Sequence, residues 1–510
     1  MSLSKKTRVN LWERNKDYAV FLPSISFFYN GYVSKQHHSQ FVPQDRIPVE
    51  FEQGVEGMNF LNKEQAYFYY PWSLYSAGHA QLDVAKSKVE ESMIHRRDRK
   101  ETMILGDSGG FQIGNGQIKF DWEHFYEKKG DSGYKGDADK VRTAILNWLE
   151  ETADYSMILD IPTRATEGKF REITKMKSFS DALNATMFNN DFFIKHRQGK
   201  TKFLNVLQGQ NGADADIWYE AVKHLPFEGW AMGGLNMRDA NLALRRLIIM
   251  RDEKLLDPGR DLIHYLGTSK LEWAVFATAM QRAIRKHINP NMTLTYDCAS
   301  PFIATAKGQV YTQHVHRNNR FSYIMDKAID DKRLSGSKTP WPWNSPVGER
   351  ITMGDVCWYA PGMLNRNNKE GKTSWDSFSY FLQMGHNVYQ HIESVQRANA
   401  LTDAACELYK PDPATWTKNK KGGEFSHWVP KNLIYIVELV NRVFTSETPM
   451  TEIERSENLI AEFNSKKTIK SSADAFNNLF EADLGDDNDT GQIDDWLDED
   501  ADDLMRDLDV

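Results

Sequence analysis

The stretch MILGDSGGFQ (Met103–Gln112) decides the fold class of this 510-residue chain. A short apolar run ends in Asp107, and a serine and two glycines then turn the chain before Phe111. A run too short for a helix that ends in a glycine-rich turn is typical of a strand buried on both faces. The same pattern, a short apolar run followed by a turn, recurs along the chain.

Short apolar runs predict eight strands, and most of them end in a polar or glycine-rich turn. They are Tyr18–Phe27, Ala66–Ser76, Met103–Asp107, Ser156–Asp160, Lys202–Gly209, Gly229–Gly234, Leu262–Gly267 and Met292–Asp297. Helical periodicity appears in Lys140–Ala153, Asp214–Leu225, Ala240–Met250 and Leu271–Ile284. Strands that alternate with helices predict a parallel sheet, and eight strands favour a closed (β/α)8 TIM barrel over an open sheet.

The predicted strand ends carry polar groups and glycines, which bears on function. In such barrels the active site is built where the strands end and the βα loops begin. These strand-end residues are Asp107, Asp160, Gln208, Gly233, Gly234, Gly267 and Asp297. We therefore expect three carboxylates and an amide to converge on one mouth of the barrel. Within the predicted helix Asp214–Leu225, the expected apolar stripe is Ile217, Ala221, Val222 and Leu225.

Charge and composition divide the chain. The barrel is expected over residues 1–410 with an insertion at 301–350, followed by a helical extension over 411–467 and an acidic, disordered tail over 468–510. Glu481–Val510 holds 14 acidic residues and one basic residue, so the remaining 480 residues carry a net charge of +5. A mildly basic body suits a polyanionic partner. Three roles are open for the acidic tail: it competes with the polyanion for the basic body, it recruits a protein partner, or it only keeps the protein soluble.

Cysteine use and hydropathy indicate the compartment. Three distant cysteines, Cys298, Cys357 and Cys406, do not form a disulfide framework and suit a reducing cytoplasm. No apolar run approaches the ~18 residues of a membrane span, and the N-terminus lacks the apolar core of a secretory signal. We expect a cytoplasmic protein without a membrane partner.

GDSGG also surrounds the nucleophile of chymotrypsin-like serine proteases, which makes Ser108 an alternative catalytic residue. Those enzymes are all-β, whereas this chain alternates strand and helix. His79, the candidate base, lies only 29 residues before Ser108, and Phe111 stands where the protease pattern has a proline. A catalytic triad is defined by geometry and roles, which five matching letters do not supply. The sequence favours Asp107 over Ser108.

Six motifs occur in the order in which the tRNA-guanine transglycosylase family has them, and the chain resembles that family over roughly residues 18–400. They are DSGGFQ (107–112), MILD (157–160), VLQGQ (206–210), AMGGL (231–235), YLG (265–267) and YDCASP (296–301). The resemblance implies that Asp297 is the nucleophile that attacks the ribose C1′ and expels guanine. Asp107 matches the general acid and base, and Phe111 matches the aromatic residue that stacks on the base.

The resemblance also implies which groups read the edge of the heterocycle. They are Asp160, Gln208 and the backbone around Gly233, Gly234 and Leu235. Pro162 stands where many bacterial members have a cysteine, so base selection near Asp160 is expected to differ. Since carboxylates carry the chemistry, no cofactor is expected to be required.

The family's structural zinc site is not recovered. Cys357 and His386 stand where two ligands would lie, but Asp355 and Ala360 occupy other ligand positions. A closed tetrahedral site needs four ligands, so we expect no zinc. A modified site of Asp355, Cys357, His386 and His391 is the alternative, which metal analysis decides.

Two further departures concern nucleic acid. The insertion contains HVHRNNR (314–320) and KTPWPWNSP (338–346), which suit contacts to phosphates and bases or a packing lid over the core. HRRDRK (95–100) is a second basic candidate for such contacts. No appended tRNA-binding domain is recognisable.

These departures resemble the phage branch of the family, the DpdA-type DNA-guanine transglycosylases. That resemblance implies exchange of guanine in DNA for a free 7-deazaguanine base such as the 7-cyano form, in the host cytoplasm, which protects phage DNA from restriction. The target nucleotide must then leave the base stack. Two alternatives stay open: the same exchange on tRNA, as in queuosine or archaeosine formation, and a catalytically silent nucleic-acid-binding protein.

Overall fold

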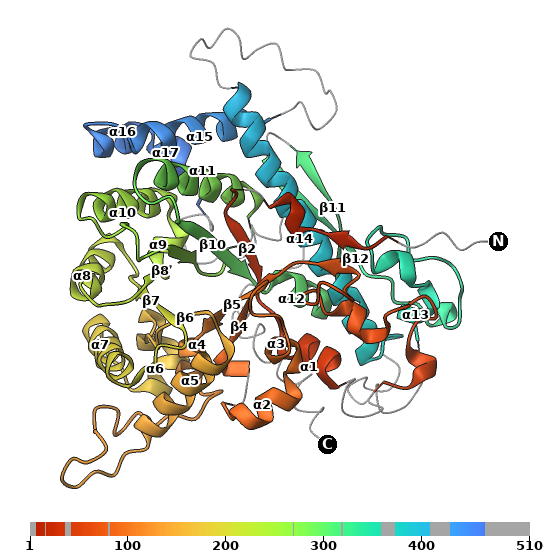
Figure 1. Ribbon diagram of the computed structural model, residues 1–510, viewed down its shortest axis with the longest axis horizontal. Coiled ribbons are helices and arrows are strands. Elements are labelled where there is room, and N and C mark those ends of the chain that lie inside the picture. The colour runs from red at the N-terminus through yellow and green to blue at the C-terminus, as the bar shows by residue number, and fades with distance from the viewer. Residues whose placement is uncertain are drawn as a thin grey trace.

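An eight-stranded, all-parallel sheet forms the centre of the computed structural model (Figure 1). The structure describes residues 7–15, 17–35, 42–79, 82–268, 270–317, 320–358, 373–408 and 429–464. The strands of this sheet are β2 (Val20–Pro23), β4 (Trp72–Ser76), β5 (Met103–Asp107), β6 (Tyr155–Met157), β7 (Lys202–Leu207), β8 (Gly229–Met232), β9 (Leu262–Tyr265) and β10 (Thr293–Cys298). Six of these strands lie within a predicted apolar run. β10 ends one residue after its run, and β6 begins one residue before its run. The strand prediction is therefore confirmed.

The sheet curls into a nearly closed barrel. Its strand order is β2-β10-β9-β8-β7-β6-β5-β4, so consecutive strands from β4 to β10 pair with one another, and the first strand, β2, pairs with the last, β10. A parallel bridge between Ser24 and Leu74 spans the seam between β2 and β4, where the Ile25 N–H donates to the Leu74 carbonyl at 3.0 Å. The predicted α/β fold with a TIM-like barrel is confirmed at this level.

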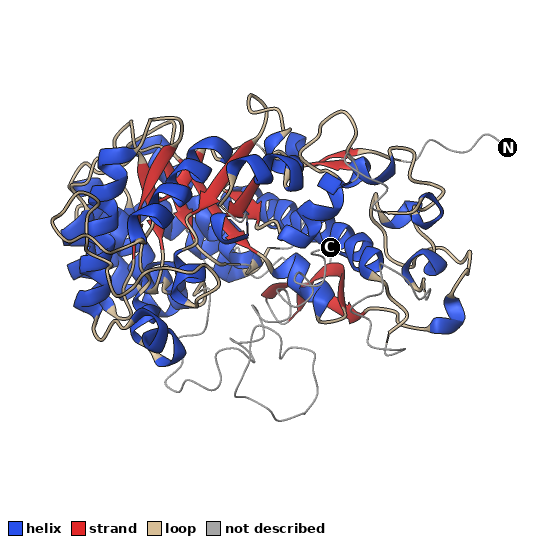
Figure 2. Cartoon of the chain, turned by 90° about the horizontal axis from the view of Figure 1, so that it is seen from below, coloured by secondary structure: helices blue, strands red, loops and turns tan. Residues whose placement is uncertain are grey.

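Helices surround the strands, as Figure 2 shows. The longer ones are α1 (Phe27–Lys35), α5 (Ala138–Thr152), α7 (Phe179–His196), α8 (Gly212–Val222), α10 (Ala240–Asp252), α11 (Leu271–His287) and α14 (Ser377–Leu408). The four predicted helices correspond to α5, α8, α10 and α11. The predicted stripe on α8 is wrong in one position, because Ile217 is 55% exposed. The buried face of α8 consists of Ala215, Trp218, Tyr219 and Val222.

Short helices follow the strands at the C-terminal end of the barrel. They are η4 (Ala77–His79), α4 (Gly110–Gly114), η5 (Thr163–Thr166), α6 (Gly168–Thr174), α9 (Leu235–Arg238) and α12 (Ser300–Ala306), while α2 (Val84–Glu90) and α3 (Ser92–His95) lie between η4 and β5. Near the N-terminus, β1 (Val9–Asn10) pairs with β3 (Phe68–Tyr69), and η1 (Trp12–Arg14), η2 (Gln44–Arg46) and η3 (Gly54–Met58) lie in the same part of the chain.

The 301–350 insertion forms a β-hairpin and a packed segment. β11 (Gln309–Arg317) and β12 (Arg320–Lys327) are antiparallel, and η6 (Lys332–Leu334), η7 (Gly348–Arg350) and α13 (Met353–Val356) follow. Trp341 is buried and its ring lies 4.7 Å from that of Trp343. The packing role expected for the tryptophans is therefore the one that the structure supports.

After α14, the chain continues in α15 (Lys431–Val443), α16 (Pro449–Arg455) and α17 (Glu457–Ala461). Val437 and Val440 lie on the buried face of α15, which packs on α11 and α14. The predicted acidic tail over 468–510 lies outside the described residues, as does Ala360. Among the described helices, none is long and apolar enough to cross a membrane.

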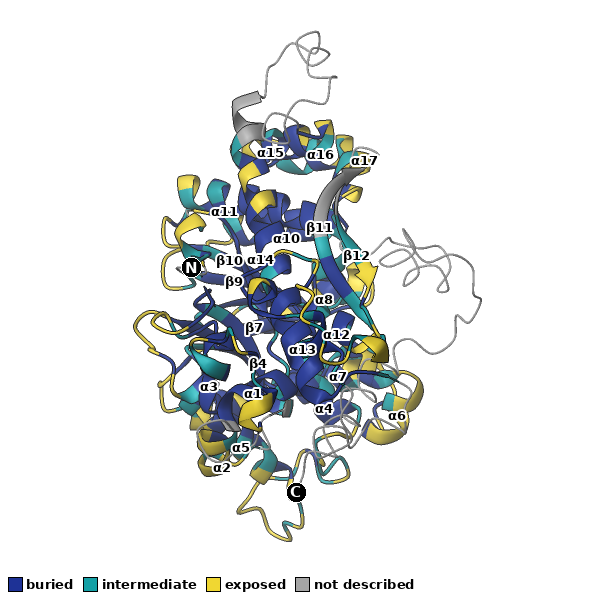
Figure 3. Cartoon of the chain, turned by 90° about the vertical axis from the view of Figure 1, so that its right-hand side faces the viewer, coloured by how far each residue is buried: buried dark blue, intermediate teal, exposed yellow. Residues whose placement is uncertain are grey.

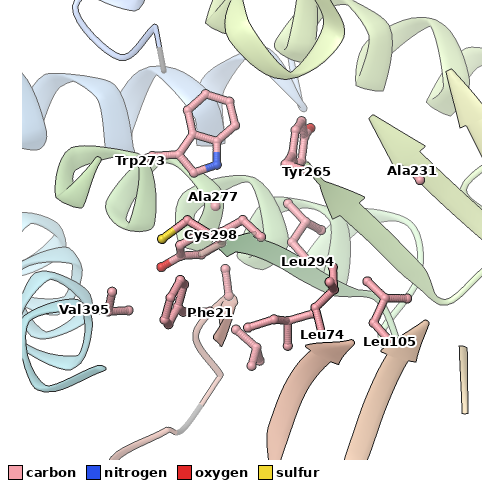
Figure 4. Close-up of a cluster of buried hydrophobic side chains, with 14 of the residues drawn as sticks. Phe21, Leu74, Leu105, Ala231, Tyr265, Trp273, Ala277, Leu294, Cys298 and Val395 are labelled. Atoms are coloured by element: carbon pink, nitrogen blue, oxygen red, sulfur yellow. The ribbon is translucent and has the colours of Figure 1, made fainter. Parts of the chain in front are cut away.

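The core lies between the barrel and its helices. Figure 4 shows strand side chains, including Phe21, Leu74 and Leu105, in one buried cluster with Trp273 and Ala277 of α11. The ring of Trp273 meets that of Tyr265 edge-on at 5.2 Å, and both are buried. Burial is continuous through the middle of the molecule in Figure 3. This packing fixes the strands whose ends carry the candidate site.

Candidate active site

Asp297 lies at the end of β10 and is held by two neighbours from the segment of β9. Thr295 and Asp297 share one face of β10 because side chains alternate along a strand. The Gly267 N–H donates to Asp297 Oδ1 at 2.8 Å. His264 Nε2 lies 3.3 Å from the same oxygen, and His264 Nδ1 lies 2.9 Å from Thr295 Oγ1. Both contacts fall on one carboxylate oxygen, which leaves Oδ2 of Asp297 as the oxygen without these constraints.

Asp107 is the last residue of β5 and is half-buried. The Gly109 N–H donates to its Oδ1 at 3.2 Å, and the Ser76 hydroxyl also bonds to it. Burial raises the pKa of Asp107, and the nearby charge of Asp297 raises it further. A carboxyl group with a raised pKa keeps its proton to higher pH, which is the property that a general acid needs.

Asp160 and Gln208 form a buried pair across neighbouring strands. Asp160 lies three residues beyond β6, and Gln208 comes directly after β7. Gln208 Nε2 donates to Asp160 Oδ2 at 2.8 Å. Burial raises the pKa of Asp160 to about 7, the charge of Asp107 adds to this effect, and the bond from Gln208 opposes it. The pair presents an acceptor and an amide, which are complementary to the polar edge of a heterocycle.

A glycine turn follows β8 beside this pair. Gly234 has φ +55°, and a Cβ there would lie 2.5 Å from the Gly209 carbonyl oxygen, so the turn requires glycine. The N–H groups of Gly233 and Leu235 donate to the carbonyls of Leu207 and Gly209, at 2.8 Å each. Between them, the N–H of Gly234 makes no hydrogen bond to any residue in the described part of the chain. This N–H is therefore the backbone donor of the turn that remains for a ligand.

Phe111 lies in α4, one turn after Asp107, and is half-buried. Its ring centroid lies 5.4 Å from that of Phe170 in α6, and the Arg164 guanidinium lies 5.9 Å from the Phe111 ring. The preceding turn is tight, because a Cβ on Gly110 would lie 2.4 Å from the Asp160 carbonyl oxygen. The Gly109–Gly110 turn thus brings Phe111 close to the loop that carries Asp160.

Ser108 does not offer a nucleophile to solvent. Its side chain is fully buried, and its Oγ has no hydrogen-bond partner among the described residues. The protease reading of GDSGG requires an accessible hydroxyl that is bonded to a histidine. The geometry supports the aspartate of this motif instead.

The weak zinc candidates lie in ordinary packing environments. His386 uses both ring nitrogens, with Ser345 Oγ at 2.8 Å and the Tyr311 carbonyl at 2.9 Å, and burial lowers its pKa to about 4. The Cys357 thiol points to the Ile329 carbonyl at 3.5 Å.

The other members of the alternative zinc set are also engaged. Asp355 caps α13 through Thr352, and His391 contacts the Tyr323 hydroxyl at 2.9 Å. No group of three or more potential metal ligands occurs in the described ranges.

The basic segment HRRDRK lies at the other end of the barrel from the carboxylates. It precedes β5, so it belongs to the end where the strands begin. Arg97 is buried and its Nη2 lies 2.8 Å from Asp154 Oδ2, while Arg99 donates to the Glu151 carbonyl. Its position and its internal partners separate this segment from the candidate site.

No protein-family model matches this chain, and no curated protein matches it. The structure brings Asp107, Asp160, Gln208, Asp297 and the Gly233–Leu235 turn to the C-terminal end of one barrel. Electrostatic interactions link Asp297 with Asp107 and Asp107 with Asp160. His264 was missed by sequence reasoning, because a single histidine within an apolar strand does not differ in sequence from a core residue.

Proposed function

We propose that the protein is a guanine transglycosylase that replaces guanine in DNA with a free 7-deazaguanine base. The observation that supports this most directly is the set of three carboxylates at one barrel mouth, of which two have raised pKa values and one has a free carboxylate oxygen. Two carboxylates in different environments suit a double displacement at a glycosidic carbon.

In the first displacement, Oδ2 of Asp297 attacks C1′ of the target nucleotide. The bond from C1′ to N9 of guanine breaks, and its electron pair goes to the departing base. Asp107 donates its proton to that base, because guanine leaves poorly as an anion. The products are a covalent ester between Asp297 and the sugar, free guanine and ionised Asp107.

In the second displacement, Asp107 takes the N9 proton of the incoming 7-deazaguanine. The N9 electron pair then attacks C1′, and the bond to Asp297 breaks to return its carboxylate. Asp107 ends protonated, as it began, so no cofactor enters the balance.

Base selection is assigned to the buried pair. Ionised Asp160 accepts hydrogen bonds from N–H groups on the guanine edge, while the Gln208 amide and the Gly234 N–H suit its carbonyl. A wrong base would leave these buried groups unpaired, which disfavours it strongly. Phe111 supplies a ring face for stacking on the base.

The choice of DNA over tRNA rests on the resemblance and is tested by direct competition. The protein is incubated with a radiolabelled 7-deazaguanine and, separately, with duplex DNA, single-stranded DNA and unmodified tRNA. We expect label in DNA from the wild type and none from Asp297→Asn. Label in tRNA alone would assign the same chemistry to the alternative substrate. If the protein binds these nucleic acids but transfers label to none of them, the catalytically silent alternative is favoured.

A further inference from the structure

A basic surface lies on and around α6, at the same end of the barrel as the candidate site. We define the α6 surface as Arg164, Lys169, Phe170, Arg171, Lys175 and Lys177. The segment Thr163–Lys177 has five basic and two acidic residues, and all five basic side chains are exposed. Figure 3 shows exposed residues in yellow on α6, beside α4.

The α6 surface is continuous with the candidate site through aromatic contacts. Phe170 contacts Phe111 at 5.4 Å between ring centroids, and the Arg164 guanidinium lies 5.2 Å from the Phe170 ring. Helix α6 also packs on α4, which carries Phe111. Phe170 and Arg164 would therefore lie beside any base that stacks on Phe111.

A shallow, open groove of ≈ 490 Å³ lies on this surface, lined by Gly168, Arg171, Glu172, Lys175 and Lys177. Arg171 and Lys175 line the groove with exposed side chains, and within the described ranges neither has an ion pair. Exposed cations that are not neutralised internally are available to an anionic ligand. The groove is open rather than enclosed, which suits an extended chain better than a small molecule.

The cavity at the opposite end of the barrel differs from the α6 surface in its charge. The cavity there has ≈ 230 Å³ and mixes basic side chains such as Arg96 with acidic ones such as Asp98 and Glu101. Its buried Arg97 is paired with Asp154. The α6 surface differs in having an excess of cations beside the carboxylates.

We infer that the α6 surface binds the phosphodiester backbone of the nucleic-acid strand next to the target nucleotide. Arg171, Lys175 and Lys177 contact phosphates, while Phe170 and Arg164 stack on the neighbouring base. This inference rests on the proposed function, since it assigns the path of that substrate. It also explains how an extruded nucleotide is held while its neighbours remain in the polymer.

The test is a charge reversal with a matched control. The test variant is Arg171→Glu/Lys175→Glu/Lys177→Glu. The control is Arg96→Glu/Lys100→Glu/Lys286→Glu, which reverses three exposed charges at the end where the strands begin. Both should unfold thermally close to the wild type. Anisotropy of a fluorescent single-stranded DNA of about 20 nucleotides is measured between about 50 and 300 mM KCl, with duplex DNA and tRNA as further arms.

We expect the test variant to bind the oligonucleotide about 10- to 100-fold more weakly, and the slope of log K against log salt to fall by about 2, since each lost phosphate contact contributes ~0.7. The control should stay within about twofold of the wild type. Calorimetric binding of free 7-deazaguanine should be unchanged in both. Such a result supports a backbone contact that is separate from base recognition.

Three outcomes overturn the inference in distinguishable ways. Equal weakening of both variants would indicate a non-specific polyanion effect. If the test variant binds the oligonucleotide as tightly as the wild type and still exchanges the base, the role of the α6 surface is overturned and the proposed function is not. A wild type that binds the free base but no nucleic acid would overturn the proposed function and the inference together.

Discussion

The two ends of the barrel use the same charged residue types in opposite ways. At the end where the strands begin, the fully buried guanidinium of Arg97 pairs with Asp154 at 2.8 Å and donates to the Thr152 carbonyl at 2.9 Å. Asp154 also accepts from the Ile104 N–H at 2.8 Å, which ties β5 to the chain before β6. The charge of Arg97 is neutralised by Asp154, and the pair links neighbouring segments of the barrel.

At the end where the strands finish, carboxylates lie close together, and His264 is the ion-pair candidate that faces one of them, Asp297. In the described part of the chain, Asp107, Asp160 and Asp297 form no ion pair with a lysine or arginine. Burial raises the pKa values of Asp107 and Asp160 instead. The buried acids at the strand ends are therefore the candidates for the proposed chemistry, whereas the matched pair at the other end stabilises the fold.

After loss of the nucleophile Asp297 itself, the largest effect is expected from Asp107→Asn. Asparagine keeps the shape of the side chain but cannot donate a proton as an acid, so base exchange should slow by about 10³-fold. Because the pKa of Asp107 is raised, wild-type activity should fall as rising pH removes its proton. The pH–rate profile of the variant should lose that alkaline limb. A variant that kept the limb would assign the acid to another group.

Arg97→Ala is the matched change at the other end. Because this substitution removes the buried guanidinium that pairs with Asp154, the free energy of unfolding should fall by about 3 kcal/mol. The rate of base exchange per folded molecule should stay as in the wild type. Urea denaturation and activity below the unfolding transition check both statements. A large loss of activity in the folded variant would break the division between the two ends.

His264 is expected to position Asp297, with an effect of about 10- to 100-fold. His264→Leu removes the nitrogen that faces Asp297 Oδ1, whereas His264→Gln offers an amide donor in its place. The leucine variant should lower kcat with little change in KM, and the glutamine variant should recover much of the rate. Similar losses in the two variants, together with lower stability, would indicate a packing role only.

The smallest effect is a gain of stability in Asp160→Asn. Burial raises the pKa of Asp160 from 3.8 to about 7, so ionised Asp160 destabilises the folded state increasingly as pH rises between these values. Asparagine avoids that cost and still accepts from Gln208. We expect the variant to be more stable by on the order of 2 kcal/mol at pH 8 and equal to the wild type below pH 4. Binding of free guanine should be lost.

The strands and most of the candidate site were predictable because they follow local rules. Each strand is a short apolar run before a turn, and Asp107, Gln208 and Asp297 stand where those runs end. A parallel barrel brings such positions to one rim whatever the loops between them do. The prediction therefore needed only the order of elements.

Features that depend on packing were not predictable in the same way. Ile217 fits an apolar stripe by spacing, but the helix turns Trp218 and Tyr219 inward, since these larger rings bury more apolar area. His264 faces Asp297 only because β9 lies beside β10, in a register that pairs His264 with Thr295. The HRRDRK segment and the α6 surface are both rich in basic residues, and only the fold places the α6 surface beside the carboxylates.

The covalent bond between the protein and the nucleic acid is the most direct test of the account. Wild-type protein and Asp297→Asn are incubated with DNA and free 7-deazaguanine, quenched in acid and digested, and peptides that carry a deoxyribose-linked mass are sequenced. The account predicts an adduct on the peptide that contains Asp297 in the wild type and none in the variant. An adduct on Asp107 or Asp160, or an equal adduct in the variant, would contradict it.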